Sequence, residues 1–473
     1  MPVRMDIGHV SPSRFFFLVV ALLLRVVTAH AESEPIVLAS GLETTELLRM
    51  IGEPLALAAG LPPKEVRFHV VLNGTLNAFA LPNQHIVFHS GLLLAVRNRD
   101  ELAGVMAHEI AHLMAGHHIQ IDSLAKKLSV QSMIAAAAGI LAGVASNNGQ
   151  VGQAVITGGM ASAQTTMLEA VRRRESQSDT LAVSLLARAG FKPEGLAGFM
   201  NRLAQQQHLT SLPPPYLMTH PVSTERLMDA RRLAEEHPPA VPLRPDQAEN
   251  RLLARAQAML EAETSDSPDQ MANQLRNRLR LDPGNPALSA ALAEALRSAG
   301  RLPEAESQLN ALLKGREKDV YLLRQRGMVR TEMGKYTEAE ADFRAGLALL
   351  PDHEELRYRQ AFALKELKKT PEASRILRQL TAQHPQNPQY FYLLGLAEGQ
   401  GGHEGEGHLA MGRYFMLIQE KKNAQWHFQE AIRLLPPGSP EQSIARNELA
   451  QTQKMETPPS ERKKKKQRVN GTR

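Results

Sequence analysis

Residues 108–112 have the sequence HEIAH, which combines the residue types and spacing that a metal-dependent hydrolase uses. His108 and His112 are four residues apart, so on a helix both imidazoles project from one face and reach a single ion. Glu109 directly follows the first histidine, where a zinc peptidase has its general base. Apolar residues at helical spacing through 99–125 predict a buried helix, in which an uncompensated glutamate would be costly. We therefore expect zinc here rather than two incidental core histidines.

A catalytic zinc needs a third protein ligand and an open position for water. His118 stands six residues after His112, the spacing of one peptidase pattern, but that pattern requires a glycine where this chain has Ala115. We expect the helix to continue to Lys127, which would make His117 and His118 flanking groups.

The other candidate for the third ligand is Glu175, in a charged stretch of a second helix that ends at 189–191. Asp179 follows one helical turn later on the same face and can accept a hydrogen bond from a ligand imidazole, which fixes the tautomer of that ring. A solvated charged face has the same pattern, so spacing alone leaves both interpretations open.

The elements around these residues are expected to include a small β-sheet. Residues 40–59 have the apolar spacing of a helix, 66–72 alternate as a strand does, and 77–89 form a strand pair around a Pro-Asn turn. Residues 90–93 then open another helix. The edge strand of such a sheet in zinc peptidases binds the substrate backbone by strand addition, although a purely structural hairpin has the same pattern. The residues expected on this edge strand are Asn77, Ala78 and Phe79.

The composition excludes several other classes of function. The 473 residues are 43% hydrophobic and 22% charged, which suits two to three globular domains. The formal charge of +6 is contained in the last thirteen residues, with seven basic residues and one acid, so a folded nucleic-acid-binding face is not expected. Because the chain has no cysteine, disulfides, thiolate zinc ligands and a thiol nucleophile are excluded.

Two apolar segments bear on export and membrane contact. Residues 15–24 are an apolar run behind basic residues, and Ala29-His30-Ala31 follows, a pattern typical of a signal peptide cleaved after residue 31. The run is short for a membrane span, although Arg25 at its end leaves retention as an anchor open. Segment 132–168 is rich in glycine and alanine but interrupted by polar residues. We expect a buried helix or a lid there, with peripheral membrane contact as the alternative.

The second half of the chain carries a 34-residue repeat, the period of tetratricopeptide repeats. The recurring residues are the alanines of Glu-Ala pairs (Ala305, Ala339, Ala373), two prolines (Pro351, Pro385), the asparagines of Asn-Pro pairs (Asn285, Asn387) and two turn glycines (Gly300, Gly334). We expect four to five repeats within 246–455, which form an α-solenoid with a concave surface for protein partners. A stack that only caps the first domain is the alternative. Residues 456–473 form a basic tail that we expect to be disordered.

Four segments together resemble the M48 family of zinc metallopeptidases: NAFALPNQHIVFHSGLL, HEIAH, RRRESQSDTLAVSLLARAGFKP and THPVSTERL. The resemblance implies a mainly α (α+β) fold, with a gluzincin-type peptidase domain that contains a small β-sheet. It also implies one zinc ion bound by His108, His112 and Glu175, with Glu109 as the catalytic base.

The same resemblance assigns roles to residues farther along the chain. It makes Asp179 the hydrogen-bond acceptor of a ligand histidine, and it places the family's His-Pro motif at His220 and the associated arginine at Arg226. His220 is then either a donor to the oxyanion of the tetrahedral intermediate or a fourth zinc ligand that holds the enzyme inactive. One departure is the turn at 82–84, which is Pro-Asn-Gln where the family usually has Pro-Gly-Gly.

The expected organisation is a signal peptide (1–31), an M48-like zinc peptidase domain (32–245), the repeat domain (246–455) and the tail (456–473). The resemblance implies a bacterial periplasmic endopeptidase of quality control, with outer-membrane proteins as substrates and their assembly machinery as a partner of the repeats. Zinc lowers the pKa of a bound water, and Glu109 would take its proton and pass it to the leaving amine. The alternatives are a repeat scaffold or chaperone with a latched protease and, more distantly, a metal-dependent hydrolase of a non-peptide amide.

Overall fold

The computed structural model describes residues 41–81, 83–116, 149–207, 216–217, 220 and 222–452, with the backbone alone for 149–168. These residues form two compact units. The first unit contains Ile51–Arg244, and the second contains Ser40–Met50 and the chain from Pro245 onward, so the first boundary falls within helix α2 (Leu42–Ala58). The predicted signal peptide, His117, His118, segment 132–148 and the basic tail lie outside the described residues.

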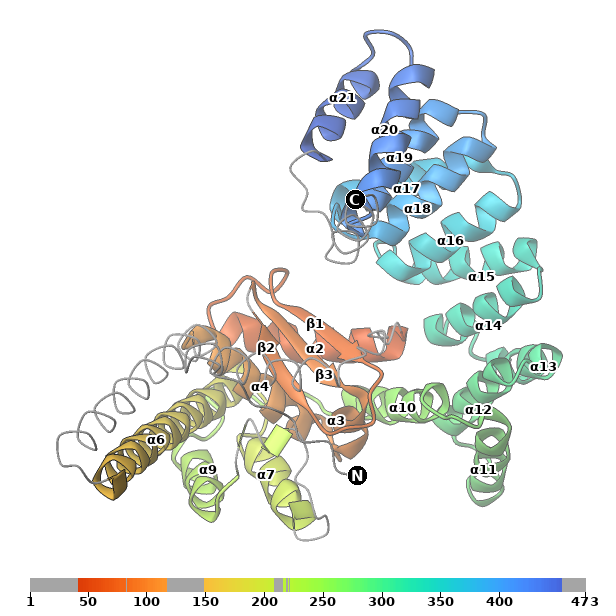
Figure 1. Ribbon diagram of the computed structural model, residues 1–473. Helices are drawn as coiled ribbons and strands as arrows, with labels where there is room; N and C mark the ends of the chain where they lie inside the picture. Colours follow the sequence, from red (N-terminus) through yellow and green to blue (C-terminus); the bar gives the residue numbers. More distant parts are fainter. Residues whose placement is uncertain are drawn as a thin grey trace, which may run out of the picture. The chain divides into compact units, whose positions relative to one another are not determined.

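The first unit combines helices with one three-stranded sheet (Figure 1). Its elements after α2 are β1 (Arg67–Val71), β2 (Ala78–Leu81), β3 (His85–His89), α3 (Ser90–Ala95), α4 (Arg99–Met114), α6 (Gly149–Ala189), α7 (Glu194–Gln207) and α9 (Thr224–Glu236). The strand order is β1-β3-β2, with β1 parallel and β2 antiparallel to β3. β2 is therefore an edge strand, and it also contacts α4. The predicted strand pair and the helix that follows it are confirmed.

The turn between β2 and β3 has hairpin geometry without glycine. Asn83 and Gln84 have φ angles of 61° and 62°, in the left-handed region that glycine adopts most easily. Asparagine tolerates this conformation, whereas Gln84 pays a steric cost for it. The two strands nevertheless pair from Ala78 opposite Phe88 onward, so the edge strand forms despite the departure from Pro-Gly-Gly.

Helix α4 begins and ends at identifiable capping residues. The side chain of Asn98 accepts a hydrogen bond from the backbone N–H of Glu101 at 2.9 Å and caps the start of the helix. The helix ends at Met114, and Gly116 follows with a φ of 63°, a conformation in which glycine terminates a helix without strain. The expectation that this helix continues to Lys127 is therefore wrong.

Helix α7 approaches α4 so closely that only glycine fits at their crossing. A Cβ atom on Gly195 would lie 2.0 Å from the carbonyl oxygen of Asp100. A Cβ atom on Gly104 would lie 2.6 Å from the backbone nitrogen of Leu196. Because the two backbones are in contact, α4 is held firmly on this side, and the position of its histidines is well defined.

Helices alone form the described part of the second unit (Figure 1). From Pro245 onward they are α10 (Gln247–Glu263), α11 (Pro268–Leu281), α12 (Pro286–Ser298), α13 (Leu302–Leu313), α14 (Val320–Glu332), α15 (Tyr336–Leu349), α16 (Glu354–Glu366), α17 (Thr370–Gln383), α18 (Pro388–Gln400), α19 (Glu404–Leu417), α20 (Lys421–Leu434) and α21 (Pro440–Thr452). We call these twelve helices the repeat array. The predicted mainly α fold, with a small sheet and a helical array, is confirmed.

The helices of the repeat array make six consecutive pairs, one more than the largest number expected. The first pair is hard to recognise because Gln270 and Met271 replace the recurring Glu-Ala.

The 34-residue period corresponds to recurring structural positions. The alanines of the Glu-Ala pairs are fully buried one turn into α13, α15 and α17. Side chains also cap the first helix of four successive pairs at this period: Asn285, Asp319, His353 and Asn387. The turns within the pairs adopt positive φ at Gly300, Gly334, Lys368 and Gly402. Among the residues the structure describes, no helix is both long and apolar enough to cross a membrane.

Candidate metal centre

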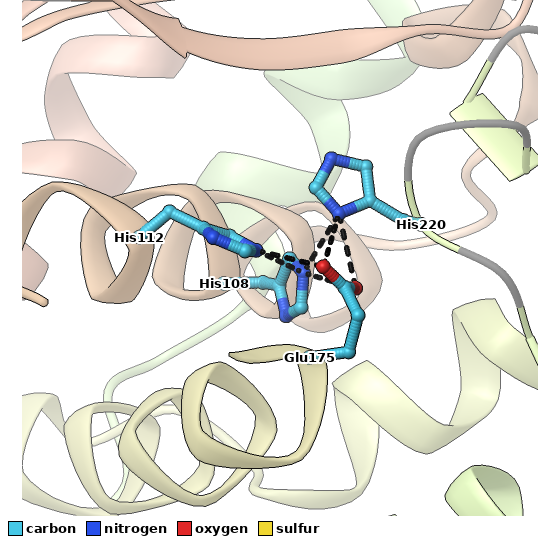
Figure 2. A group of neighbouring side chains, drawn as sticks. All are labelled: His108, His112, Glu175 and His220. Carbon is cyan, nitrogen blue, oxygen red and sulfur yellow. Dashed lines mark hydrogen bonds and ion pairs between the residues drawn. The ribbon is translucent and has the colours of Figure 1, made fainter. Parts of the chain in front are cut away.

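Two histidines of α4 bring their ring nitrogens together. Nε2 of His108 lies 3.0 Å from Nε2 of His112, and the two rings meet edge to face with their centroids 4.6 Å apart. His108 is almost fully buried, and His112, one turn later, is partly exposed. The predicted helical spacing therefore delivers two nitrogen donors to one place (Figure 2).

Glu175 reaches the same place from α6, which packs beside α4 (Figure 1). Its Oε2 lies 3.4 Å from Nε2 of His108, and its Oε1 lies 3.4 Å from Nε2 of His112. The side chain is buried, and a carboxylate at this depth needs cations or hydrogen-bond donors to stabilise its charge. The two helices thus supply nitrogen and oxygen donors to a common centre.

His220 joins this group from the segment before α9 (Figure 2). Its Nδ1 lies 3.1 Å from Oε2 of Glu175 and 3.3 Å from Nε2 of His108. Tyr216 supports it, because the backbone N–H of His220 donates to the carbonyl oxygen of Tyr216 at 2.7 Å. His108, His112, Glu175 and His220, which we call the metal cluster, each offer a ligand atom within 4.8 Å of the others. No other set of three or more potential ligands among the described residues meets this distance.

Glu109 is buried beside the metal cluster and has an unsatisfied oxygen. Its Oε1 makes no hydrogen bond within the described residues, and Nε2 of His220 lies 3.6 Å away. A buried carboxylate oxygen without a donor is available to accept a proton from water or substrate. This availability is what a general base requires.

Asp179 and Arg226 orient the metal cluster from outside. Oδ1 of Asp179 lies 3.0 Å from Nδ1 of His108, on the ring nitrogen opposite the one that faces Glu175. Arg226 donates from Nε and Nη2 to the two oxygens of Asp179, at 2.8 Å and 2.9 Å, and its Nη1 lies 3.0 Å from Oε2 of Glu175. Arg226 therefore offsets the charge of two buried carboxylates and holds Asp179 against His108.

The protonation of the metal cluster follows from these contacts. Burial raises the pKa of Glu175, but its hydrogen bonds to the three histidines outweigh burial and hold the pKa well below its usual value. Burial lowers the pKa of His108, whereas its hydrogen bonds to Asp179 and Glu175 raise that pKa to about 10. Burial dominates for His112 and lowers its pKa. The centre of the cluster therefore favours a cation, either a proton on His108 or a metal ion in its place.

Zinc fits this donor set. It binds imidazole nitrogen and carboxylate oxygen, and three protein ligands with one further position are typical of its catalytic sites. His108, His112 and Glu175 would be the three ligands, and His220, whose Nδ1 lies 3.1 Å from Oε2 of Glu175, could supply a fourth. A carboxylate behind a ligand histidine, such as Asp179 behind His108, is the usual outer support of such a site.

The predicted substrate-binding residues lie at the start of β2. Ala78 and Phe79 are its first residues, and the carbonyl oxygen of Asn77 accepts a hydrogen bond from the backbone N–H of His89 at 2.9 Å. The outer side of β2 pairs with no strand of the described sheet. The strand also contacts α4. An extended peptide that paired with this edge strand would therefore run near α4, the helix that carries His108 and His112.

Tyr216 was not identified from the sequence as a residue of the site. Tyr216 is buried, and its ring lies against that of His220 with centroids 4.7 Å apart. Burial raises the pKa of this tyrosine, and the charges of Glu109 and Glu175 raise it further. Its spacing of four residues before His220, one helical turn, is the sequence signal that could have found it.

Both parts of the chain are similar to known proteins. Residues 42–234 match the model of peptidase family M48, and residues 330–397 match a tetratricopeptide repeat model. The chain is 27% identical to the beta-barrel assembly-enhancing protease of Yersinia pestis over 362 residues, which is 76% of this chain and 73% of that protein. It is 32% identical to the beta-barrel assembly-enhancing protease of Escherichia coli (strain K12) over 197 residues, which is 42% of this chain and 40% of that protein. The peptidase match contains the entire metal cluster.

Proposed function

The chain carries a peptidase family M48 domain followed by tetratricopeptide repeats, and from this premise we propose that it is a periplasmic zinc-dependent endopeptidase that acts on outer-membrane proteins during their assembly. The observation that carries the proposal is the convergence of His108, His112 and Glu175 beside the unsatisfied carboxylate of Glu109. The names of the two bacterial relatives support the substrate class. The signal-peptide pattern at 1–31 supports export.

The residues of this chain divide the work of peptide hydrolysis among them. A zinc ion in the metal cluster would supply a Lewis acid and lower the pKa of water. Glu109 would accept the proton of the attacking water, since its Oε1 accepts no hydrogen bond from the described residues, and would then pass it to the leaving amine. Asp179 holds the ring of His108 with Nε2 directed into the cluster. Arg226 offsets the charge of the carboxylates around it.

His220 would control access to this chemistry. In the conformation described, its Nδ1 lies within 4.8 Å of the other potential ligand atoms, so it would take the fourth position of a bound zinc ion and exclude water. Rotation of the side chain away from Glu175 would open that position. The same imidazole could then donate to the oxyanion of the tetrahedral intermediate.

A second candidate function is that of a scaffold or chaperone whose peptidase is held closed. The observation that favours it is again His220, because its position among the ligands is that of a latch. The repeat array offers long helical surfaces for protein partners, and the assembly machinery of outer-membrane proteins is the partner class that we propose. The two functions are compatible within one chain.

The substitution Glu109→Gln tests the peptidase. It should retain one zinc ion per chain but lower casein cleavage by about 10²- to 10⁴-fold, because glutamine keeps the shape of the side chain and cannot accept the proton. Zinc content is measured by atomic absorption, and cleavage by the release of labelled fragments. The exposed Glu169 of α6 provides the matched control, Glu169→Gln, which should keep both properties. Full cleavage by the Glu109→Gln variant would overturn the assignment.

His220→Ala separates the two roles of that histidine. Faster casein cleavage at unchanged zinc content would support the latch, whereas loss of cleavage would support the oxyanion role.

The scaffold function has its own readout, the rescue of an outer-membrane assembly defect. If the Glu109→Gln variant rescues as well as wild type, the scaffold function dominates.

A further inference from the structure

A second pair of histidines, in the repeat array, has the same nitrogen-to-nitrogen spacing as the first two residues of the metal cluster. His408 lies on α19 and His427 on α20, two helices that pack side by side (Figure 1). Their Nδ1 atoms are 3.0 Å apart, as are the Nε2 atoms of His108 and His112. Two nitrogens that each bind one ion at about 2.0–2.1 Å, at an angle between square and tetrahedral, are roughly 3 Å apart. The pair is therefore spaced to chelate a metal ion.

Aromatic neighbours hold both imidazoles in place. The ring of Phe415 stacks on that of His427 with centroids 5.1 Å apart and an interplanar angle of 19°. The ring of Trp426 meets His408 edge to face at 5.3 Å. Ligand side chains whose orientation is fixed by packing lose little conformational entropy on binding. The pair is thus organised before any ion arrives.

A cavity open to solvent lies beside the two histidines, and other potential metal-ligand side chains line it. His408 and His427 line a cavity of about 420 Å³ whose other walls include Glu404, Met411 and three glycines. Glu404 precedes His408 by one helical turn on α19, and Met411 follows it by one turn. No third histidine or acid of the described chain lies as close to this pair as the ligands of the metal cluster lie to one another. Water would therefore complete the coordination.

We propose that His408 and His427 form a second metal site, which binds a divalent transition-metal ion through the two Nδ1 atoms. Among such ions copper(II) should bind most tightly, because imidazole sites follow the Irving–Williams order. A bound ion would link α19 to α20 and stabilise the end of the array. The competing explanation is that the two rings only share a hydrogen bond, in which one Nδ1 donates to the other. This inference is independent of the peptidase activity proposed above.

Trp426 makes the site directly observable, because it is the only tryptophan of the chain. Copper(II) sulfate is titrated into the full chain loaded with zinc, and tryptophan fluorescence is recorded. We expect saturable quenching of this tryptophan, since its ring lies 5.3 Å from that of His408. His408→Ala and His427→Ala should each raise the midpoint of quenching at least tenfold. The matched control is His384→Ala, which removes a histidine of α17's C-terminal end and should leave the midpoint unchanged.

Two further measurements keep the outcome decisive. Circular dichroism shows whether the variants fold, and the pair His408→Gln and His427→Gln replaces the alanine variants if those unfold. Electron paramagnetic resonance of the copper complex should report two nitrogen ligands. A third variant carries substitutions of both His408 and His427. If this variant is folded and its quenching curve superimposes on that of wild type, the proposal is overturned, and the two rings only share a hydrogen bond.

Discussion

The two units of this chain position their key side chains in opposite ways. In the first unit, the metal cluster draws on α4, α6 and the segment before α9, and each ligand occurs once. In the repeat array, a buried alanine, an N-cap and a turn recur every 34 residues. A change in the metal cluster therefore has no substitute within the chain. A change in the array can be judged against the equivalent position in the neighbouring repeats.

The largest effect should come from the support of a metal ligand that has no counterpart elsewhere. Asp179→Asn should weaken zinc binding by about 10- to 100-fold, because the carboxylate that faces Nδ1 of His108 loses its charge. Zinc affinity is measured by competition with a chromogenic chelator. Thermal unfolding of the metal-free protein shows separately whether the variant is folded.

An exposed aspartate of the same unit is the control for this change. Asp229 pairs with Arg232 on the surface of α9 at 3.1 Å, and its replacement by asparagine should leave zinc affinity unchanged. If Asp179→Asn binds zinc as tightly as wild type, the carboxylate does not support the ligand. The contrast between unique and repeated positions would then lose its main example.

How much of the metal cluster was predictable depended on distance along the chain. The His108 and His112 pair followed from the geometry of one helix, which places residues four apart on the same face. Glu175 did not follow from spacing, because its place depends on how α6 packs against α4, and its pattern is shared with a solvated face. The resemblance to a known family supplied that residue and His220. Tyr216 was missed, because one helical turn before His220 is a weak signal within a proline-rich stretch.

The repeat array was more predictable because its signals recur. The alanines and asparagines that revealed the 34-residue period occupy recurring structural positions: Ala305, Ala339 and Ala373 are buried, and Asn285 and Asn387 are helix N-caps followed by proline. The caps between them, Asp319 and His353, escaped notice because capping accepts several residue types. The end of α4 was mistaken for a different reason. A single glycine, Gly116, outweighed the helical pattern that followed it.

The array also matches residue sizes across each pair of helices. Where the first helix has glycine, the second presents a larger side chain: a Cβ on Gly327 would lie 2.6 Å from the ring of Phe343, and one on Gly395 would lie 2.6 Å from Met411. In two other repeats the equivalent position of the first helix is alanine, and the second helix presents leucine. These pairs are Ala293 with Leu309 and Ala361 with Leu377, each pair buried in a common cluster.

This size matching predicts a compensating pair of substitutions. Gly327→Ala should destabilise the array by about 1–3 kcal/mol, because the new methyl group would overlap the ring of Phe343. Adding Phe343→Leu recreates the combination found at Ala361 and should recover most of that loss. The free energy of unfolding is obtained from urea titrations of the single and double variants, which form a double-mutant cycle.

A second glycine within a helix serves as the control for this cycle. A Cβ on Gly399 of α18 would meet no atom within 4 Å, so Gly399→Ala should be neutral or stabilising, as helix propensity requires. Additive effects of Gly327→Ala and Phe343→Leu would contradict the size matching. The repeats would then tolerate each position independently.

The smallest expected effect concerns Lys368, the one non-glycine residue among the four positive-φ residues that recur every 34 residues in the turns of the repeat array. Lys368 has a φ of 60° where Gly300, Gly334 and Gly402 have 73°, 73° and 82°, and a left-handed residue with a side chain is strained by about 1–2 kcal/mol. Part of the gain on removing that strain is offset by the greater freedom of glycine in the unfolded chain. Lys368→Gly should therefore stabilise the array by about 1 kcal/mol and raise its melting temperature by about 2–4 °C. Gly334→Lys, the reverse change one repeat earlier, should lower it by a similar amount. A fall in melting temperature for Lys368→Gly would mean that this turn, unlike its neighbours, depends on its side chain, and equivalence among the repeats would fail at that position.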